Sequence, residues 1–312
     1  MEKVEYGGWP NCIRLSNGTV DVIATTDVGP RIIRYGFVGR ENELHEDASQ
    51  MGKTGGDEWR GYGGHRLWHA PEAKPRTYWP DNFPVKYEAA GNALRLIQDT
   101  EPTTGIQKEI EVSLPGKDSH VQVTHRLTNT NLWAVEFAPW ALTVMRKGGR
   151  AVFPQEPYSP HPDIPDYPGQ KIDPNYYLPV RNLIMWSYTK LSDPRWAFTE
   201  KYIILKQDPN AARPQKIGMS NRQNWAAYAN DGHLFVKKTA YQPGATYPDN
   251  GCNFETFTNA DMLELESLGP MVELAPGATA THVEDWYLFD GVSFAATDES
   301  IDAAVGARVG SV

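Results

Sequence analysis

The chain has 312 residues, which is enough to bury a substantial hydrophobic core. Its 27 glycines, 24 prolines and aromatic content of 11% favour many short strands joined by tight turns over long helices. The net charge of −9 argues against a nucleic acid partner, because proteins that bind nucleic acids usually present a basic face.

The cysteines and the N-terminal residues narrow the class further. Cys12 and Cys252 stand far apart and in no metal-ligand spacing, so neither a disulfide framework nor a thiolate zinc site is expected. The first residues lack the apolar stretch of a secretion signal, and no window approaches the roughly 18 apolar residues of a membrane span. We therefore expect a cytoplasmic protein without a membrane partner.

In chain order, β-branched and aromatic runs flank the turn sequence Asp27-Val28-Gly29-Pro30 and predict an opening hairpin. Strands are predicted at 20–24, 31–38, 85–89, 93–98, 106–114, 119–128, 133–145, 183–188, 202–206, 225–229 and 234–239. No segment has the pattern of a four-turn amphipathic helix. The sequence thus predicts an all-β fold, a large antiparallel β-sandwich that forms one domain over residues 1–312.

Two long segments, 52–82 and 153–180, show neither the helical nor the strand period. The first is rich in Gly, Trp and Arg, and the second contains repeated prolines that disfavour helices and central strands. Long irregular insertions in a compact domain are often functional, so we expect both to be loops, the second of them a lid or rim.

The sequence GGHRLWHAPE in the first of these segments could hold a ligand in either of two ways. His65, His69 and Glu72 would share one face of a helix and suit a metal, but the glycine pair and the proline disfavour a helix, so no metal is expected. We prefer hydrogen bonding to a polyhydroxylated ligand, with Arg66 as a fork of donors and Trp68 as an apolar plate. The alternative is a loop in which these residues satisfy backbone groups.

The acidic residues near the C-terminus form the second concentration of interest. Successive side chains of a strand point to opposite faces, so Asn253 and Glu255 share one side and Phe254 takes the other. Phe254 can then anchor the core while Glu255 projects to a binding surface. Glu264 and Glu266 also share a face, either as a carboxylate pair or as part of an ordinary solvated surface.

Sugars present an apolar C–H face and a rim of hydroxyls, so their sites combine flat aromatic rings with carboxylates, amides, His and Arg. The candidate aromatic plates are Trp59, Trp68, Trp79, Trp140, Tyr158 and Trp186. The sequence contains no phosphate-binding loop, no dinucleotide fingerprint and no nucleophile elbow. A small carbohydrate is therefore the expected partner.

The run NFETFTN, a strand ending in LGP, and ELAPGATATHVEDWYLF resemble the C-terminal part of the galactose mutarotase-like (aldose 1-epimerase) superfamily, and GPRIIRYGFVGRENEL resembles its opening hairpin. The resemblance extends over nearly the whole length of the chain. The resemblance implies a β-sandwich with a concave sugar-binding face and no metal or cofactor. In mutarotases a glutamate takes the proton of the anomeric hydroxyl while a histidine protonates the ring oxygen, which opens the ring.

Matched by position, the base is Glu255, and a carboxylate whose pKa is raised by partial burial is competent near neutral pH. The histidine of the family has no counterpart, because the matching strand reads EFAPWAL, with Trp140 about where the histidine is expected. His65, His69 and His161 are the candidates for the acid. The candidate substrate contacts are Arg31, Arg66, Trp68, Glu72, Trp140, Asn253 and Glu264.

Two alternatives to an aldose 1-epimerase-like enzyme remain open. The first is a carbohydrate-binding protein without activity on the same scaffold, which the missing histidine favours. The second is a glycoside hydrolase or lyase that uses two carboxylates, Glu255 with Glu264 or Glu266, at a separation of about 5 to 9.5 Å.

Overall fold

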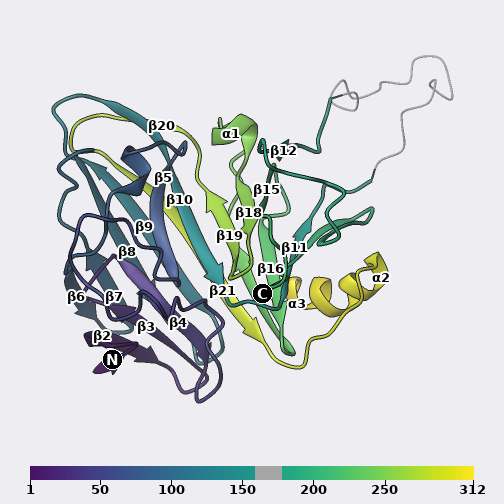
Figure 1. Cartoon of the computed structure of the whole chain (residues 1–312), viewed down its shortest axis with the longest axis horizontal. Helices are drawn as coiled ribbons and strands as arrows, with labels where there is room; N and C mark the ends of the chain where they lie inside the picture. Colours follow the sequence, from purple (N-terminus) through teal and green to yellow (C-terminus); the bar gives the residue numbers. More distant parts are fainter. Residues whose placement is uncertain (159–177) are drawn as a thin grey trace.

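The computed structural model describes residues 1–158 and 178–312. These residues form two large antiparallel β-sheets that pack face to face, with short helical segments beside them (Figure 1). The all-β fold predicted from the sequence is therefore confirmed.

The first sheet contains the strands that matter most for the site. Its order is β1 (Glu2–Tyr6), β2 (Trp9–Ser16), β3 (Val20–Thr25), β4 (Arg31–Phe37), β5 (His65–Ala70), β10 (Val135–Met145), β19 (Leu263–Leu268), β18 (Phe254–Thr258), β15 (Gln215–Met219) and β12 (Leu183–Met185), and β20 (Val272–Leu274) pairs with β10 outside this path. In Figure 1, β5, β10, β19, β18 and β15 follow one another across the middle of the molecule.

The second sheet packs against the first. Its order is β13 (Trp196–Phe198), β14 (Tyr202–Lys206), β11 (Arg150–Pro154), β16 (Trp225–Asn230), β17 (His233–Lys238), β21 (Thr279–Phe289), β9 (Val121–Asn129), β8 (Ile106–Ser113), β7 (Ala93–Ile97) and β6 (Lys86–Ala90). The helical segments are η1 (Arg76–Tyr78), α1 (Pro248–Gly251), α2 (Asp298–Ile301), η3 (Asp302–Gly306) and α3 (Ala307–Val309). Among the described residues, none of these helices is long and apolar enough to cross a membrane.

The main hydrophobic core lies between the two sheets, in a layer that we call the interlayer. Strand β9 shows why: its residues alternate between buried and more exposed, and Val121, Val123 and Leu127 contribute to the core. The same alternation places Leu265 of β19 and Phe254 of β18 in the interlayer. Along each strand of the first sheet, successive side chains therefore alternate between the interlayer and the outer face.

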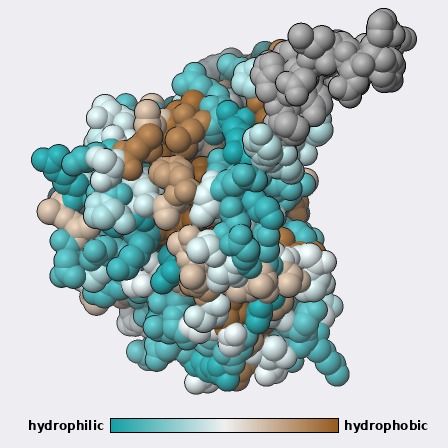
Figure 2. Space-filling model, turned by 90° about the vertical axis from the view of Figure 1, so that its right-hand side faces the viewer, coloured by the Kyte–Doolittle hydropathy of each residue, from teal (hydrophilic) through white to brown (hydrophobic). Residues whose placement is uncertain are grey.

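The outer faces of both sheets are partly covered. On the second sheet, Ile301, Val305 and Val309 of the C-terminal helical segment pack against Tyr202 and Trp225. Figure 2 shows the side of the molecule on which this segment lies as mainly hydrophilic with patches of hydrophobic residues. On the first sheet, a separate hydrophobic cluster covers the strands and is built of Trp68, Ala70, Ala138, Trp140, Leu142 and Leu268.

Two of the sequence expectations need correction. The segment 52–82 was expected to be an irregular loop, but it contains β5, a strand whose six residues are all buried. The expectation is wrong there because both faces of β5 carry polar and aromatic side chains, so the apolar alternation that identifies a strand is missing. Strand β15 was also not predicted. Most of the expected lid at 153–180, and His161 with it, lies outside the described residues.

Candidate functional site

One patch on the outer face of the first sheet brings together most of the chemically interesting residues. Directly paired residues of neighbouring strands share a face. The register pairs Leu142 of β10 with Arg66 of β5 on one side and with Glu266 of β19 on the other. Glu266 in turn pairs with Glu255 of β18. Glu255, Glu266 and Arg66 therefore lie on the same face of the sheet, turned away from the interlayer.

Lys216 of β15 lies at the centre of the patch. Its Nζ atom is 2.8 Å from Oε2 of Glu255 and donates a hydrogen bond of 3.1 Å to Oε2 of Glu266. Glu264, further along β19, is paired with Arg66 at 2.9 Å. Glu264 and Glu266 had been considered as an ordinary solvated surface, but both are buried and each contacts a cation. The three glutamates thus belong to one site.

Aromatic rings enclose the charged groups of this patch. The Nζ atom of Lys216 lies 4.8 Å from the ring centre of Trp140 and 4.7 Å from that of Trp186, so the ammonium group is held between two indoles. Trp140 also donates from Nε1 to Oε2 of Glu266 at 2.9 Å. Beside them, Trp68 packs against Trp140 with 5.3 Å between ring centres. Flat apolar surfaces and carboxylates therefore occur together, as a sugar site requires.

The ionisation of the patch follows from burial and from the shared lysine. Burial raises the pKa of Glu255 well above its usual value, and the neighbouring Glu266 raises it further, while Lys216 acts in the opposite direction. Burial also raises the pKa of Glu266. For Lys216, burial alone would lower the pKa, but the two glutamates raise it well above its usual value. One lysine therefore serves two carboxyl groups, and Glu255 keeps its proton more readily than a free glutamate does.

A cavity of about 370 Å³ opens beside Glu255. Its lining residues are Glu72, Ala73, Lys74, Tyr78, Trp140, Trp186, Asp249 and Glu255. The Oε1 atom of Glu255 is buried and has no hydrogen-bond partner among the described residues. Its Oε2 atom contacts Lys216 as an ion pair, but the contact does not have the angles of a hydrogen bond. Buried polar atoms are normally paired, so the carboxyl group is suited to bind a ligand that enters the cavity.

The expectation that His65 or His69 supplies a proton to this carboxyl group does not fit the structure. Both residues belong to β5, where side chains alternate, and they point to the interlayer while Arg66 points to the outer face. The ring of His65 lies instead against Trp286 and His125 from the opposite sheet. None of the described histidines lines the cavity beside Glu255.

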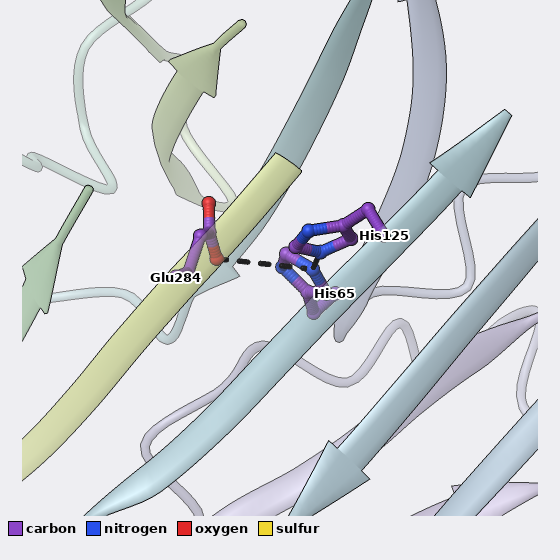
Figure 3. Close-up of side chains that lie close together, drawn as sticks. All are labelled: His65, His125 and Glu284. Carbon is purple, nitrogen blue, oxygen red and sulfur yellow. Dashed lines mark hydrogen bonds and ion pairs between the residues drawn. The ribbon is translucent and has the colours of Figure 1, made fainter. Parts of the chain in front are cut away.

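His65, His125 and Glu284 form a second cluster, inside the interlayer (Figure 3). Nδ1 of His125 lies 2.9 Å from the carbonyl oxygen of His282, so this nitrogen carries a proton. Nε2 of a neutral His125 then accepts the proton on Nε2 of His65, at 2.7 Å, and Nδ1 of His65 accepts from the hydroxyl of Thr143 at 2.9 Å. Burial lowers the pKa of both histidines, which agrees with two neutral rings.

Two imidazoles and a carboxylate are ligands that zinc accepts, and their ligand atoms lie within 4.8 Å of one another. Charge argues against such a site. Glu284 already pairs with Nζ of Lys237 at 2.8 Å and accepts from Nε1 of Trp286 at 2.8 Å. A divalent ion would add two positive charges to a fully buried place where the only carboxylate is neutralised. We interpret this cluster as a hydrogen-bonded part of the core.

Three further candidate contacts have other partners in the structure. The amide of Asn253 is engaged on both sides by the backbone of Asn221, so it fixes the chain at the start of β18. Arg31 is fully buried and pairs with Asp81 at 3.0 Å. Glu72 accepts a hydrogen bond from the hydroxyl of Tyr78 and lines the cavity, so it can reach a ligand.

Lys216 was not identified from the sequence as a neighbour of Glu255, and Trp186 was only one of several candidate aromatic residues. Lys216 stands in the short strand Gln215–Met219, which sequence patterns did not identify. An alternation through QKIGM with Ile217 and Met219 inward would have placed Lys216 on the outer face, but nothing local names its partners. Trp186 is one of the six candidate aromatic plates, and its ring lies against Lys216, as the ring of Trp140 does.

The two carboxylate pairs proposed for a glycoside hydrolase or lyase, Glu255 with Glu264 and Glu255 with Glu266, find little support in this geometry. Glu266 is fully buried, does not line the cavity, and shares Lys216 with Glu255. Glu264 is held by Arg66. Neither carboxylate faces Glu255 across an open gap, which that chemistry requires.

Comparisons with known proteins place the fold. A comparison with protein-family models finds no match, and a comparison with curated proteins finds none either. Among solved structures, the chain is similar to the Slr1438 protein of Synechocystis sp. PCC 6803, with a TM-score of 0.57, 11% identity, and coverage of 93% of this chain and 100% of that one. A galactose mutarotase-like protein of Lactobacillus casei gives a TM-score of 0.56 and 11% identity, with coverage of 89% and 100%.

A galactose mutarotase related enzyme of Lactobacillus acidophilus gives a TM-score of 0.51 and 8% identity, with coverage of 90% of this chain and 98% of that one. At such low identity the similarity concerns the fold and carries no residue roles. The resemblance noted in the sequence is confirmed at the level of the fold.

Proposed function

On the premise that this chain has the galactose mutarotase-like fold, we propose that it binds a sugar in the cavity beside Glu255 and exchanges its anomers, as an aldose 1-epimerase does. The observation that carries the proposal is the carboxyl group of Glu255, which is buried beside Trp140 and Trp186 and has an oxygen atom without a partner among the described residues. Similarity of fold alone would not support an activity.

A single carboxyl group can perform both proton transfers of this reaction. The hydroxyl and ring oxygens of an aldose are bonded to the same carbon atom, as are the two oxygens of Glu255, so the two pairs can face each other. One oxygen of neutral Glu255 donates its proton to the ring oxygen and the bond from that oxygen to the anomeric carbon breaks. The other oxygen takes the proton of the anomeric hydroxyl as the aldehyde forms. Glu255 ends neutral, and the reverse step after rotation gives the other anomer.

This route accounts for a cavity that none of the described histidines lines. It requires the acid form of Glu255, which its raised pKa favours, and it creates no net charge in a buried site. Trp140 and Trp186 provide flat surfaces for the sugar ring. Lys216 and Glu266 act behind Glu255 and set its ionisation.

The test is the rate of anomer exchange, measured by NMR magnetisation transfer over a panel of aldoses. We expect Glu255→Gln to reduce the catalysed rate about 100-fold or more, since general acid–base catalysis contributes roughly 10²–10⁴. Glu111→Gln, which removes a carboxylate paired with Arg126 on the second sheet, is the matched control and should leave the rate unchanged.

The pH profile separates one carboxyl group from an acid–base pair. With Glu255 alone, the rate falls only on the alkaline side, as its proton is lost, whereas a separate base and acid give a bell-shaped profile. If no aldose equilibrates faster than in buffer, the catalytic proposal is wrong. Sugar binding without exchange would then favour a carbohydrate-binding protein, the alternative that the missing histidine supports.

A further inference from the structure

A second cavity lies next to the one that contains Glu255. It has a volume of about 460 Å³ and is lined by Pro179, Val180, Arg181, Asn182, Ser220, Arg222, Tyr241, Ala245, Thr246, Tyr247, Asn250 and Gly251. Both cavities are lined by residues of α1: Asp249 lines the first, and Asn250, the next residue, lines the second. Adjacent Cα atoms are about 3.8 Å apart, so the two linings come close to each other at this segment.

The charge of the second cavity is opposite to that of the first. Among the described residues, its lining includes two arginines and no carboxylate, although the whole chain has a net charge of −9. The first cavity is lined by Glu72, Asp249 and Glu255, with Lys74 as its one basic lining residue. An anionic group is therefore favoured in the second cavity and disfavoured in the first.

Both arginines are held in place without being neutralised. The guanidinium of Arg222 lies 5.8 Å from the ring centre of Tyr241, which stacks on Tyr247 with 5.3 Å between ring centres. Arg222 forms no ion pair with any of the described residues. Arg181 donates from Nε and Nη2 to the backbone carbonyl of Glu156, at 2.9 and 2.6 Å. A carbonyl orients the guanidinium but leaves its full charge available.

The carboxylate of Glu156 contacts the backbone of Arg222 and forms no ion pair with the guanidinium group of either arginine among the described residues. Glu156 accepts from the backbone N–H of Arg222 at 3.2 Å, and its side chain also lies 3.4 Å from the amide nitrogen of Gln223. The wall is also ordered, since Nδ2 of Asn182 donates to the carbonyl of Asn250 at 2.8 Å. Ser220 and Thr246 add hydroxyl groups to the lining.

We infer that the second cavity binds an oxyanion, a phosphate or a carboxylate, carried by the sugar whose anomeric carbon lies at Glu255. Planar guanidinium groups match the two oxygens of either anion, and Tyr241 keeps the guanidinium of Arg222 in position. The inference rests on the proposed function for the identity of the sugar site. The two can fail separately, because anion binding is measured without turnover.

The test is isothermal titration with three probes that share one ring: a neutral hexose, the corresponding hexuronate and the corresponding hexose 6-phosphate. We expect at least one anionic sugar to bind 10-fold or more tightly than the neutral one. Arg222→Gln should weaken binding of that anion roughly 10- to 100-fold and leave the neutral sugar unchanged. The preferred anion tells carboxylate from phosphate.

Arg213→Gln is the matched control, because it makes the same change of charge on an exposed residue outside both cavities. Equal affinity for neutral and anionic sugars would overturn the inference, as would an Arg222→Gln protein that binds the anion as tightly as the native one. Glu255→Gln separates the two proposals: it should abolish anomer exchange and retain binding of the anion. Selective anion binding without exchange would leave the inference standing while the catalytic proposal falls.

Discussion

A buried lysine–glutamate cluster lies on each side of the first sheet: the second sheet provides the one in the interlayer, and the first sheet provides the one on its own outer face. In the interlayer, Lys237 pairs with Glu284 beside three histidines. On the outer face, Lys216 pairs with Glu255 and Glu266. The fully buried polar side-chain atoms of the interlayer cluster all have partners, whereas Glu255 and Glu266 each retain an oxygen atom without one among the described residues.

This difference separates structural from functional burial of charge. A buried polar network in which every member is satisfied specifies the packing of the core. A buried group without a partner costs stability, and such a cost is retained where the group has another use. The outer cluster adjoins the cavity lined by Glu255, Trp140 and Trp186. Perturbed pKa values alone would not have distinguished the two, because both clusters have them.

Removal of Lys237 or Lys216 should give the largest change in stability and tests the difference between the two clusters most directly. Lys237→Met leaves Glu284 charged and buried between the sheets, and we expect a loss of about 3–5 kcal/mol in the free energy of unfolding. Lys216→Met should cost less, about 1–3 kcal/mol, because Glu255 and Glu266 can take up a proton beside the cavity. Urea denaturation at pH 7 measures both. Equal losses of stability would mean that the glutamates of the outer cluster are as unable to take up a proton as Glu284 is.

The pH dependence of stability should have opposite signs for the two clusters. Burial lowers the pKa of His282 to about 3, from 6.5 in the unfolded chain. Between these values the unfolded chain binds a proton that the folded one does not, so this contribution is complete above pH 6.5 and is lost as the pH falls towards 3. Glu255 has a raised pKa, so its contribution is present at low pH and is lost as the pH rises from 4.5 through the folded value.

Urea denaturation from pH 4 to 7 measures these slopes. His282→Gln, which keeps a donor for Ser267, should remove about 1.4 kcal/mol per pH unit from the loss of stability below pH 6.5. Glu255→Gln should change the slope in the opposite sense. A slope that is the same in His282→Gln and the native protein would show that His282 titrates alike in the folded and unfolded chains, contrary to its lowered pKa.

The sequence predicted the faces of the strands better than the partners of the residues on them. Alternation correctly separated Phe254, in the core, from Glu255, on the outer face, because the period of a strand is a local property. It failed for His65 and His69, since the strand that contains them was not recognised and they were assigned to a loop. Because β5 is a strand, its side chains alternate between the two faces of the sheet. Arg66 therefore points to the site, and His65 and His69 point to the interlayer.

The position of Lys216 illustrates what local patterns do not contain. It lies 39 residues before Glu255 and 50 before Glu266, and it meets them only because β15 pairs with β18, which pairs with β19. Such strand order depends on long-range packing, not on the composition of the strand itself. The fold class could therefore be predicted from the sequence, and so could the face of the strand on which Glu255 lies, while the cation beside it could not.

A matched pair of tryptophan substitutions should give the smallest change in stability, and it tests whether the two clusters differ in their effect on the chemistry. Trp140 and Trp286 each donate from Nε1 to a glutamate, Glu266 at 2.9 Å and Glu284 at 2.8 Å. Each change to Phe removes one hydrogen bond to a carboxylate, and we expect about 1–2 kcal/mol of lost stability in both cases. Their consequences for the chemistry should differ.

In Trp140→Phe, Glu266 loses a donor that favours its charged form, so its pKa rises further and it becomes neutral more readily. A neutral Glu266 no longer repels the negative charge of Glu255. Lys216 then pairs with Glu255 alone, so the pKa of Glu255 falls. Because the proposed reaction uses the acid form of Glu255, the alkaline limb of the anomer-exchange profile should move to lower pH. Trp286→Phe acts on the opposite face and should leave that limb in place. A shift of the limb to higher pH in Trp140→Phe, or the same shift in both variants, would contradict the role given to the Glu255, Glu266 and Lys216 group.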